Sequence, residues 1–292
     1  MPNFDKLIGN EKIKRELTET MEKQKVSHSY MFVGKSGIGK RLFAREFAKG
    51  LLGNLPKDIL NYEDYKEIGP LDGKKIISVD QIREIIKEAN ELPTESEKRV
   101  FVIDEADKMN VEAQNSILKT LEEPPEYVVI ILIVTNESKM LETIKSRCNI
   151  IKFDTLKKEE IETFLEQNDL LDKSRKDVEI KLLNGSLENV NNLNSMLENY
   201  DYLKVLVSSI KKKDIPQALN NGLLLYESKD DIIGLLDLLN IVFLEERLTK
   251  CVFVVENTKT KILQNNNYNM CIDNLIMKSI DSIWRRRKNW KT

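Results

Sequence analysis

Apolar residues form short, nearly unbroken runs in the first half of the chain. Residues 29–33, 99–103 and 128–134 are almost wholly apolar, which is typical of strands buried on both faces of a parallel sheet. The runs at residues 74–78 and 149–153 predict two more strands. The polar stretch at residues 54–72 contains prolines and glycines and therefore predicts an irregular connection.

Helical spacing of apolar residues separates these strands. Ile13, Leu17 and Met21 lie four residues apart, and residues 79–89 and 113–121 also place apolar side chains at helical intervals. Each of these stretches predicts an amphipathic helix. Strands that alternate with helices predict an α/β fold whose parallel sheet is covered on both sides. In such sheets, ligands bind at the carboxyl ends of the strands.

Beyond residue 154 the apolar spacing is helical throughout. Residues 156–167 and 178–183 predict two helices, with Gly185 at the end of the second and Ser186 as the cap of a third. Longer amphipathic runs without strand alternation follow. We therefore expect three domains, namely an α/β domain at residues 1–154, a small helical domain at residues 155–198 and an all-α domain at residues 199–292.

Composition narrows the class of protein. The chain has 292 residues, of which 41% are hydrophobic and 32% charged, with a formal net charge of −2. This predicts a soluble globular protein without a global positive charge for binding nucleic acid on its own. No apolar run suits a signal peptide or a membrane span, so we expect a cytoplasmic protein. The three cysteines are scattered without a CxxC pair, which argues against a zinc finger and a disulfide framework.

Residues 34–41 lie between the first strand and a helix and have nearly the pattern of a phosphate-binding P-loop. Glycines at Gly34, Gly37 and Gly39 would let backbone N–H groups turn toward phosphates, and Lys40 would reach the β- and γ-phosphates. The Ser or Thr hydroxyl that binds Mg²⁺ is replaced by Arg41. We interpret the stretch as a degenerate P-loop, compatible with weak ATP or ADP binding but not with efficient hydrolysis. The alternative is a glycine turn without a ligand.

Other candidate residues follow the predicted strands. Asp104 and Glu105 end one strand; in P-loop enzymes the first such carboxylate orients Mg²⁺ and the second polarises water, whereas the alternative is a solvated acidic turn. Thr135 and Asn136 end the next strand, at the same expected edge of the sheet. Arg147 belongs to a Ser-Arg-Cys motif. It either forms a surface ion pair or reaches into a neighbouring subunit's nucleotide site.

Several stretches together resemble the clamp-loader branch of the AAA+ ATPases. These are residues 4–9, residues 28–34, the sequence QNSILKTLEEPP at residues 114–125 and the Ser-Arg-Cys motif at residues 146–148. The resemblance covers roughly the first two thirds of the chain. It implies a AAA+ P-loop domain followed by a helical lid and an all-α domain that carries oligomerisation.

The resemblance also implies functional roles. Arg147 would be an arginine finger for the adjacent ATPase, and Lys40 the P-loop lysine. The two carboxylates at 104 and 105 would be a Walker B pair, and Thr135 with Asn136 a sensor. The implied partners are the gamma/tau ATPase subunits and the delta subunit of bacterial DNA polymerase III, and through that complex the sliding clamp and primed DNA.

The chain departs from this branch at two further places. Residues 51–76 lack the four cysteines of the usual zinc module, so we expect no zinc. The lid segment at residues 185–189 has Asn189 where the branch carries an arginine that touches the γ-phosphate. Together with Arg41, this favours a subunit that does not hydrolyse ATP itself and requires no cofactor.

Two alternatives remain open. An active gamma/tau-like ATPase is compatible with the intact Lys40, Asp104 and Glu105. A DNA-binding adaptor would use the basic tail at residues 285–288, although the net charge of −2 argues against this as the main role. We interpret that tail as a solvated helix end, because charge runs are usually exposed.

Overall fold

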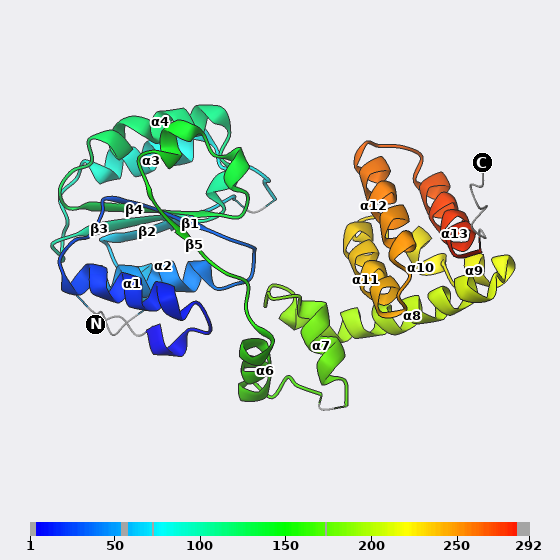
Figure 1. Cartoon of the computed structure of the whole chain (residues 1–292). Coiled ribbons are helices and arrows are strands. Elements are labelled where there is room, and N and C mark those ends of the chain that lie inside the picture. Colours follow the sequence, from blue (N-terminus) through cyan, green and yellow to red (C-terminus); the bar gives the residue numbers. More distant parts are fainter. Residues whose placement is uncertain (1–3, 54–57, 72, 173, 285–292) are drawn as a thin grey trace, which may run out of the picture. The chain divides into compact units, whose positions relative to one another are not determined.

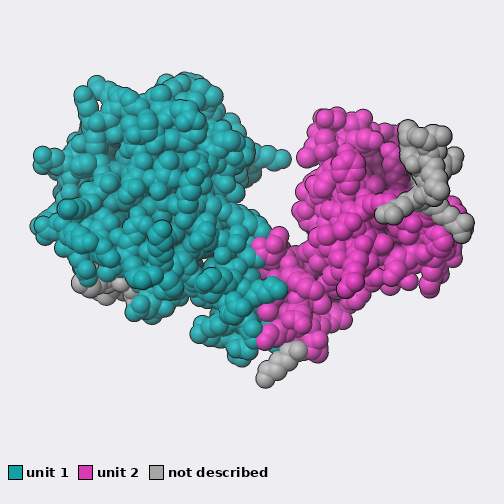
Figure 2. Space-filling model, viewed as in Figure 1, with its two compact units in different colours: residues 1–171, 185–188 teal, residues 172–184, 189–292 magenta. Residues whose placement is uncertain are grey.

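The computed structural model describes residues 4–53, 58–71, 73–172 and 174–284. Two compact units make up the chain (Figure 2). The first unit comprises Met1–Leu171 with Gly185–Glu188, and the second comprises Asp172–Asn184 with Asn189–Thr292. The first unit contains the sheet and the second is helical, so an α/β region is followed by a helical one, as the sequence predicts.

A parallel sheet forms the centre of the first unit. Its strand order is β2-β3-β4-β1-β5, and every ladder between neighbouring strands is parallel. Val33 is paired with Val134, and Ile103 with Leu132, so the strand ends that precede Gly34, Asp104 and Thr135 meet at one edge. The strands are β1 (Ser29–Val33), β2 (Tyr65–Ile68), β3 (Arg99–Ile103), β4 (Val128–Val134) and β5 (Asn149–Lys152).

The two faces of the sheet bury alternate side chains, because neighbouring residues of a strand point to opposite sides. Tyr30 and Phe32 pack with helices α1 and α2, whereas Met31 and Val33 pack with α3, α4 and α5 on the other face (Figure 1). Each central strand is therefore apolar along nearly its whole length, apart from Ser29 at the start of β1 and Arg99 at the start of β3. The helices are α1 (Glu11–Glu22), α2 (Lys40–Leu51), α3 (Val79–Ala89), α4 (Val111–Glu122) and α5 (Glu142–Lys145).

One predicted strand is misplaced. Residues 74–78 form no strand; Ile77 makes a single bridge to Met109. The strand that completes the sheet is β2. It lies within residues 54–72, for which we expected an irregular connection. Lys66 and Glu67 of β2 are charged but have partners, which are Glu84 and Glu88 for the lysine and arginines of α2 for the glutamate. These ion pairs allow a polar sequence to form an edge strand.

The helical unit has its own apolar core. Helix α11 packs against both α8 and α12, and α12 packs against α13. Leu206, Leu236 and Phe243 are fully buried there. Its helices are α7 (Lys176–Leu183), α8 (Leu193–Lys212), α9 (Ile215–Asn220), α10 (Leu223–Glu227), α11 (Ile232–Glu245), α12 (Thr249–Leu263) and α13 (Tyr268–Trp284), while α6 (Lys158–Gln167) belongs to the first unit.

The junction after α7 differs from the sequence prediction. Asn184 and Gly185 both have positive φ, 46° and 76°, and so end the helix as left-handed residues. Ser186 caps no helix: the next helical residues are Val190–Asn192 in a 3-10 turn, followed by α8. Helix α8 runs through the boundary that we expected between residues 198 and 199. The division into three domains stays a prediction, and the basic tail lies outside the described residues.

Candidate functional site

The P-loop begins directly after β1 and ends at the first turn of α2. Gly37 and Gly39 have φ values of 69° and 91°, in the left-handed region that favours glycine. Lys40 is only 5% exposed. Its ammonium group donates hydrogen bonds to the carbonyl oxygens of Gly34 at 2.6 Å and Lys35 at 2.7 Å. The loop thus has a P-loop conformation in which the lysine is bonded to the loop's own backbone.

Burial and nearby carboxylates have opposite effects on the ionisation of Lys40. Burial lowers the pKa of Lys40, while the carboxylates of Asp104, Asp107 and Glu188, in decreasing order of effect, act in the opposite direction. Burial also raises the pKa of Asp104, and Arg41 opposes that change. The predicted lysine and carboxylate therefore share one partly desolvated site.

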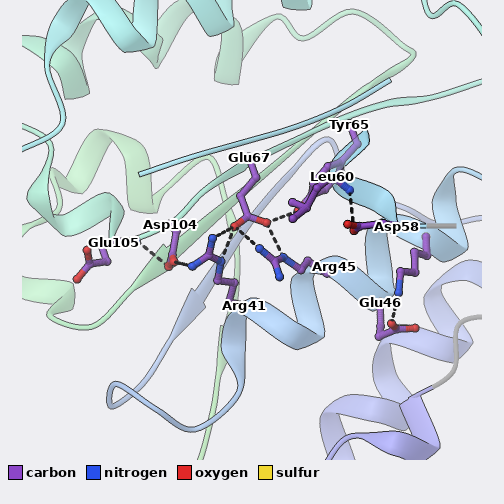
Figure 3. A network of polar contacts seen from close by, with 10 residues as sticks. Arg41, Arg45, Glu46, Asp58, Leu60, Tyr65, Glu67, Asp104 and Glu105 are labelled. Atoms are coloured by element: carbon purple, nitrogen blue, oxygen red, sulfur yellow. Dashed lines mark hydrogen bonds and ion pairs between the residues drawn. The ribbon is translucent and has the colours of Figure 1, made fainter. Parts of the chain in front are cut away.

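Arg41 occupies the position at which a P-loop carries the Ser or Thr hydroxyl that binds Mg²⁺. Its guanidinium is paired with Glu67 and lies 3.5 Å from Oδ2 of Asp104 (Figure 3). The guanidinium has only N–H donors and no lone pair to give to a metal. The Walker B-like aspartate is therefore paired with a cation that belongs to the chain.

Glu67 is the centre of this cluster. Its side chain is 5% exposed and accepts hydrogen bonds from Arg45 at 2.7 and 2.9 Å and from the Tyr65 hydroxyl at 2.6 Å. Burial works against ionisation, yet the hydrogen bonds from Arg45 and Tyr65 and the charge of Arg41 hold the pKa of Glu67 below its ordinary value. Figure 3 shows Arg41 and Arg45 converging on this carboxylate from α2.

Glu105 is not directed at the P-loop. Its φ is 51°, and its carboxylate pairs with Lys108 at 2.6 Å. Its backbone N–H donates to Oδ1 of Asp104 at 2.9 Å, which fixes the aspartate. In Figure 3 the side chain of Asp104 faces Arg41, while that of Glu105 points away. The structure therefore brings only the first residue of the predicted pair to the P-loop.

The predicted sensor residues lie at the end of β4, and both are exposed. The backbone N–H of Thr135 donates to Oδ1 of Asp107 at 3.0 Å, which ties β4 to the turn after β3. Oδ1 of Asn136 accepts hydrogen bonds from the N–H and hydroxyl of Ser138, so this side chain caps a turn.

Arg147 lies just beyond α5. It donates to the carbonyl oxygen of Thr143 at 2.7 Å and to the Ser146 hydroxyl at 3.2 Å, and it forms an ion pair with Glu122 of α4. Its side chain is 31% exposed. These partners lie outside the P-loop and outside the cluster around Glu67. Burial raises the pKa of the neighbouring Cys148 to about 12, so this thiol stays protonated.

A buried amide holds the element that carries Arg147. Gln114 of α4 is 2% exposed and donates to the carbonyl oxygens of Met109 at 3.2 Å and Lys139 at 3.0 Å. Its Oε1 accepts from the N–H of Leu141, just before α5, at 2.9 Å. This side chain therefore connects the turn after β3 with the segment leading to Arg147.

The segment Gly185–Glu188 lies against the P-loop within the first unit. The Ser186 hydroxyl donates to the carbonyl oxygen of Ser36, and the Leu187 N–H donates to that of Gly37, both at 2.8 Å. The Ser36 hydroxyl donates to Oε1 of Glu188 at 2.8 Å. That Asn189 replaces the γ-phosphate-contacting arginine stays a prediction; both Glu188 and Asn189 are exposed, and Glu188 contacts the P-loop through Ser36.

A small apolar cavity of about 90 Å³ adjoins the loop. The cavity is lined by Lys6, Leu7, Ile8, Ile38, Gly39, Leu42, Phe43, Leu156, Phe164 and Leu187.

The described residues contain no cluster of metal-ligating side chains large enough to suggest a metal site. Across the helices that the structure describes, none combines the length and apolar character needed to cross a bilayer.

Sequence reasoning identified Lys40, Arg41 and Asp104, which the structure brings together. It missed Glu67 and Glu188 because both belong to stretches far from the P-loop in sequence. In β2, Glu67 follows Lys66 in the short sequence Tyr-Lys-Glu-Ile, so no apolar pattern marked this glutamate as a strand residue. No local pattern marks Glu188 as a neighbour of Ser36.

The fold and the loop define a class, which is a AAA+ P-loop domain followed by helices. This fold has counterparts among solved structures. A gamma subunit-related protein of DNA polymerase III from Thermotoga maritima aligns over 91% of this chain and 99% of its own, with a TM-score of 0.56 and 19% identity. A variant of RuvB from the same organism aligns over 71% of this chain and 67% of its own, with a TM-score of 0.50 and 14% identity.

The chain belongs to the family described as DNA polymerase III, delta subunit, whose model matches residues 9–157. Among curated relatives, it is 33% identical to subunit gamma from Buchnera aphidicola over 56% of this chain and 48% of that one. It is 35% identical to subunit delta' from Pseudomonas aeruginosa, over 42% of each chain. It is 34% identical to subunit delta' from Bacillus subtilis, over 53% of this chain and 50% of that one. The chain thus spans about half the length of these relatives, or less.

Proposed function

We propose that this chain is a delta-prime-type subunit of a bacterial clamp loader that does not hydrolyse ATP but completes the active site of a neighbouring ATPase. The observation that carries the proposal is the position of Arg41 between Glu67 and Asp104. Mg²⁺ needs oxygen ligands in a near-octahedral arrangement. The guanidinium held beside Asp104 takes up the carboxylate that would otherwise bind Mg²⁺. Its positive charge also repels the metal ion.

The second carboxylate supports the same proposal. A residue that polarises the attacking water must reach the water from within the site. Glu105 is instead paired with Lys108, and 45% of its side chain is exposed. A P-loop with a fixed cation and without a placed base has the shape of a nucleotide site but lacks two parts of the hydrolytic machinery.

Arg147 is the residue that we propose to act on the neighbour. Its guanidinium is partly exposed, and its ion pair with Glu122 holds it on the surface of this chain. An exposed ion pair of this kind contributes little to stability, so it can be exchanged for phosphate oxygens at low cost. The proposed partners are gamma/tau-type ATPase subunits and a delta subunit, with the sliding clamp and primed DNA bound through the assembled complex in the cytoplasm.

The test is ATP hydrolysis by the reconstituted complex. We expect Arg147→Ala to leave assembly intact and to reduce hydrolysis at the neighbouring site by roughly 10³-fold or more, the range of an arginine finger supplied in trans. Arg147→Lys should recover only part of this loss, because lysine lacks the planar fork.

The matched control is Arg83→Ala, which removes an exposed, ion-paired arginine of α3. That variant should hydrolyse ATP in the complex at the wild-type rate. If the Arg147→Ala complex hydrolyses ATP and loads clamps as fast as wild type, Arg147 has no such role.

An active gamma/tau-like ATPase is the second candidate, because Lys40 is intact and gamma-type relatives match as well as delta'-type ones. The isolated chain discriminates between the two. Turnover that requires Mg²⁺ and disappears in Lys40→Ala would favour the active enzyme. We expect no turnover above background.

A further inference from the structure

The contact between Gly185–Glu188 and the P-loop is unusually close. A Cβ atom built on Gly37 would lie 2.3 Å from both the amide nitrogen of Glu188 and the hydroxyl of Ser186. There is therefore no space for even one carbon atom between the segment and this part of the loop. We call Gly185–Glu188 the latch.

Side chains and backbone of the latch satisfy polar groups of the loop. The carbonyl oxygens of Ser36 and Gly37 accept hydrogen bonds from Ser186 and Leu187, and the Ser36 hydroxyl donates to Glu188. The Glu188 N–H in turn donates to the Ser186 hydroxyl at 3.1 Å, which shapes the latch itself. Because these bonds involve both backbone and side chains of the loop, they hold the latch in one register on it.

The charge of the latch is opposite to what a phosphate site needs. A P-loop attracts anions through its N–H groups, the helix N-terminus and its lysine. Glu188 adds a carboxylate beside Ser36, and its charge favours the protonated form of Lys40. An incoming polyphosphate would meet this negative charge and the closed latch at Gly37 together.

We propose that Gly185–Glu188 is an internal latch whose carboxylate, at Glu188, excludes polyphosphate anions from the P-loop. This inference deepens the proposed function and rests on it, because a subunit that only completes a neighbour's site has no need to admit a nucleotide. It assigns Glu188 a role separate from that of Arg41: Arg41 opposes the metal, and Glu188 opposes the phosphates.

The experiment is equilibrium binding of ATP and of pyrophosphate to the isolated full-length chain at low salt, without Mg²⁺. Pyrophosphate tests the loop without any contribution from a base. We expect Glu188→Gln to bind both ligands about tenfold more tightly than wild type, since a unit charge a few ångströms away is removed. Glu188→Arg should bind more tightly still.

The matched control is Glu166→Gln, which removes an exposed carboxylate of α6, a helix of the same unit, and should bind like wild type. The proposal is overturned if wild type binds pyrophosphate as tightly as Glu188→Gln, or if neither Glu188 variant gains affinity. If Glu166→Gln gains as much affinity as Glu188→Gln, the effect comes from the net charge of the chain and not from the position of Glu188. That result would also overturn the proposal.

Amide hydrogen exchange gives an independent readout. The Leu187 N–H is bonded to the Gly37 carbonyl oxygen, so it should be protected in wild type and exchange faster in Glu188→Gln and in Ser36→Ala. An unprotected Leu187 amide in wild type would mean that the latch is open in solution. Both measurements use the isolated chain, whereas the Arg147 test uses the complex, so either proposal can fail while the other stands.

Discussion

Arg41 changes the P-loop because its charge is fixed in place. A bound Mg²⁺ would have to compete with the guanidinium for Asp104, and two cations a few ångströms apart repel each other. Glu67 holds the guanidinium from the other side and is itself held by Arg45 and Tyr65. The arginine is thus part of a cluster, so replacing Arg41 alone leaves Glu67 paired with Arg45.

The stability of that cluster should depend on pH through Glu67. Its pKa is lowered in the folded chain, so its contribution is present above the unfolded value of about 4.3 and is lost as the pH falls through the folded pKa. We expect Glu67→Gln to lower the free energy of unfolding by about 1–3 kcal/mol at pH 7, because one acceptor and its charge are removed from two arginines.

Urea unfolding at several pH values measures this difference. It should shrink as the pH falls below the unfolded value of about 4.3, and disappear below the lowered pKa of folded Glu67, where the wild-type side chain is also neutral. Glu84→Gln removes an exposed carboxylate that pairs with Lys66 and should cost almost nothing. If the difference in the free energy of unfolding between wild type and Glu67→Gln stays constant down to about pH 3, the ionised Glu67 carboxylate is not its source.

At the scale of single elements, β2 is the part of the sheet that the sequence does not reveal. Buried strands such as β4 are recognisable because every residue is apolar. β2 has one neighbouring strand, and its charged side chains are neutralised by residues from α2 and α3. Partners that are remote in sequence leave no local signal, so propensity alone predicts a loop there.

Asp64, just before β2, anchors this edge of the sheet. Its carboxylate is fully buried and accepts hydrogen bonds from the N–H groups of Thr94, Glu95 and Ser96 at 2.7, 2.8 and 2.8 Å. We expect Asp64→Ala to destabilise the chain by about 3 kcal/mol, because three backbone N–H groups lose their fully buried, charged acceptor.

Chemical denaturation and exchange of those three amides measure this effect. Asp58→Ala is a suitable control, since that carboxylate caps a 3-10 turn with one bond to Leu60 and should cost about 1 kcal/mol. If both variants lose the same free energy of unfolding, the three hydrogen bonds of Asp64 stabilise the chain no more than the single bond of Asp58.

For the whole molecule, the order of an α/β region before a helical region follows from the change of apolar period near residue 154. The finer division does not, because helix α8 continues through the expected boundary and Gly185–Glu188 packs with the first unit although the residues on either side belong to the second. Among site residues, a strand end or a glycine loop predicted Lys40 and Asp104. The contacts of Glu188 and Glu122 depend on long-range packing.

Two cores with separate contacts should unfold separately. Phe101 of β3 and Phe243 of α11 are both completely buried, one in each unit. Replacing either with Ala should cost about 3–5 kcal/mol, because a cavity of the same size is left. In calorimetry we expect two transitions, with Phe101→Ala lowering the midpoint of one and Phe243→Ala that of the other. If both variants shift a single, common transition by the same amount, the units unfold as one cooperative body, and each core depends on the other for its stability.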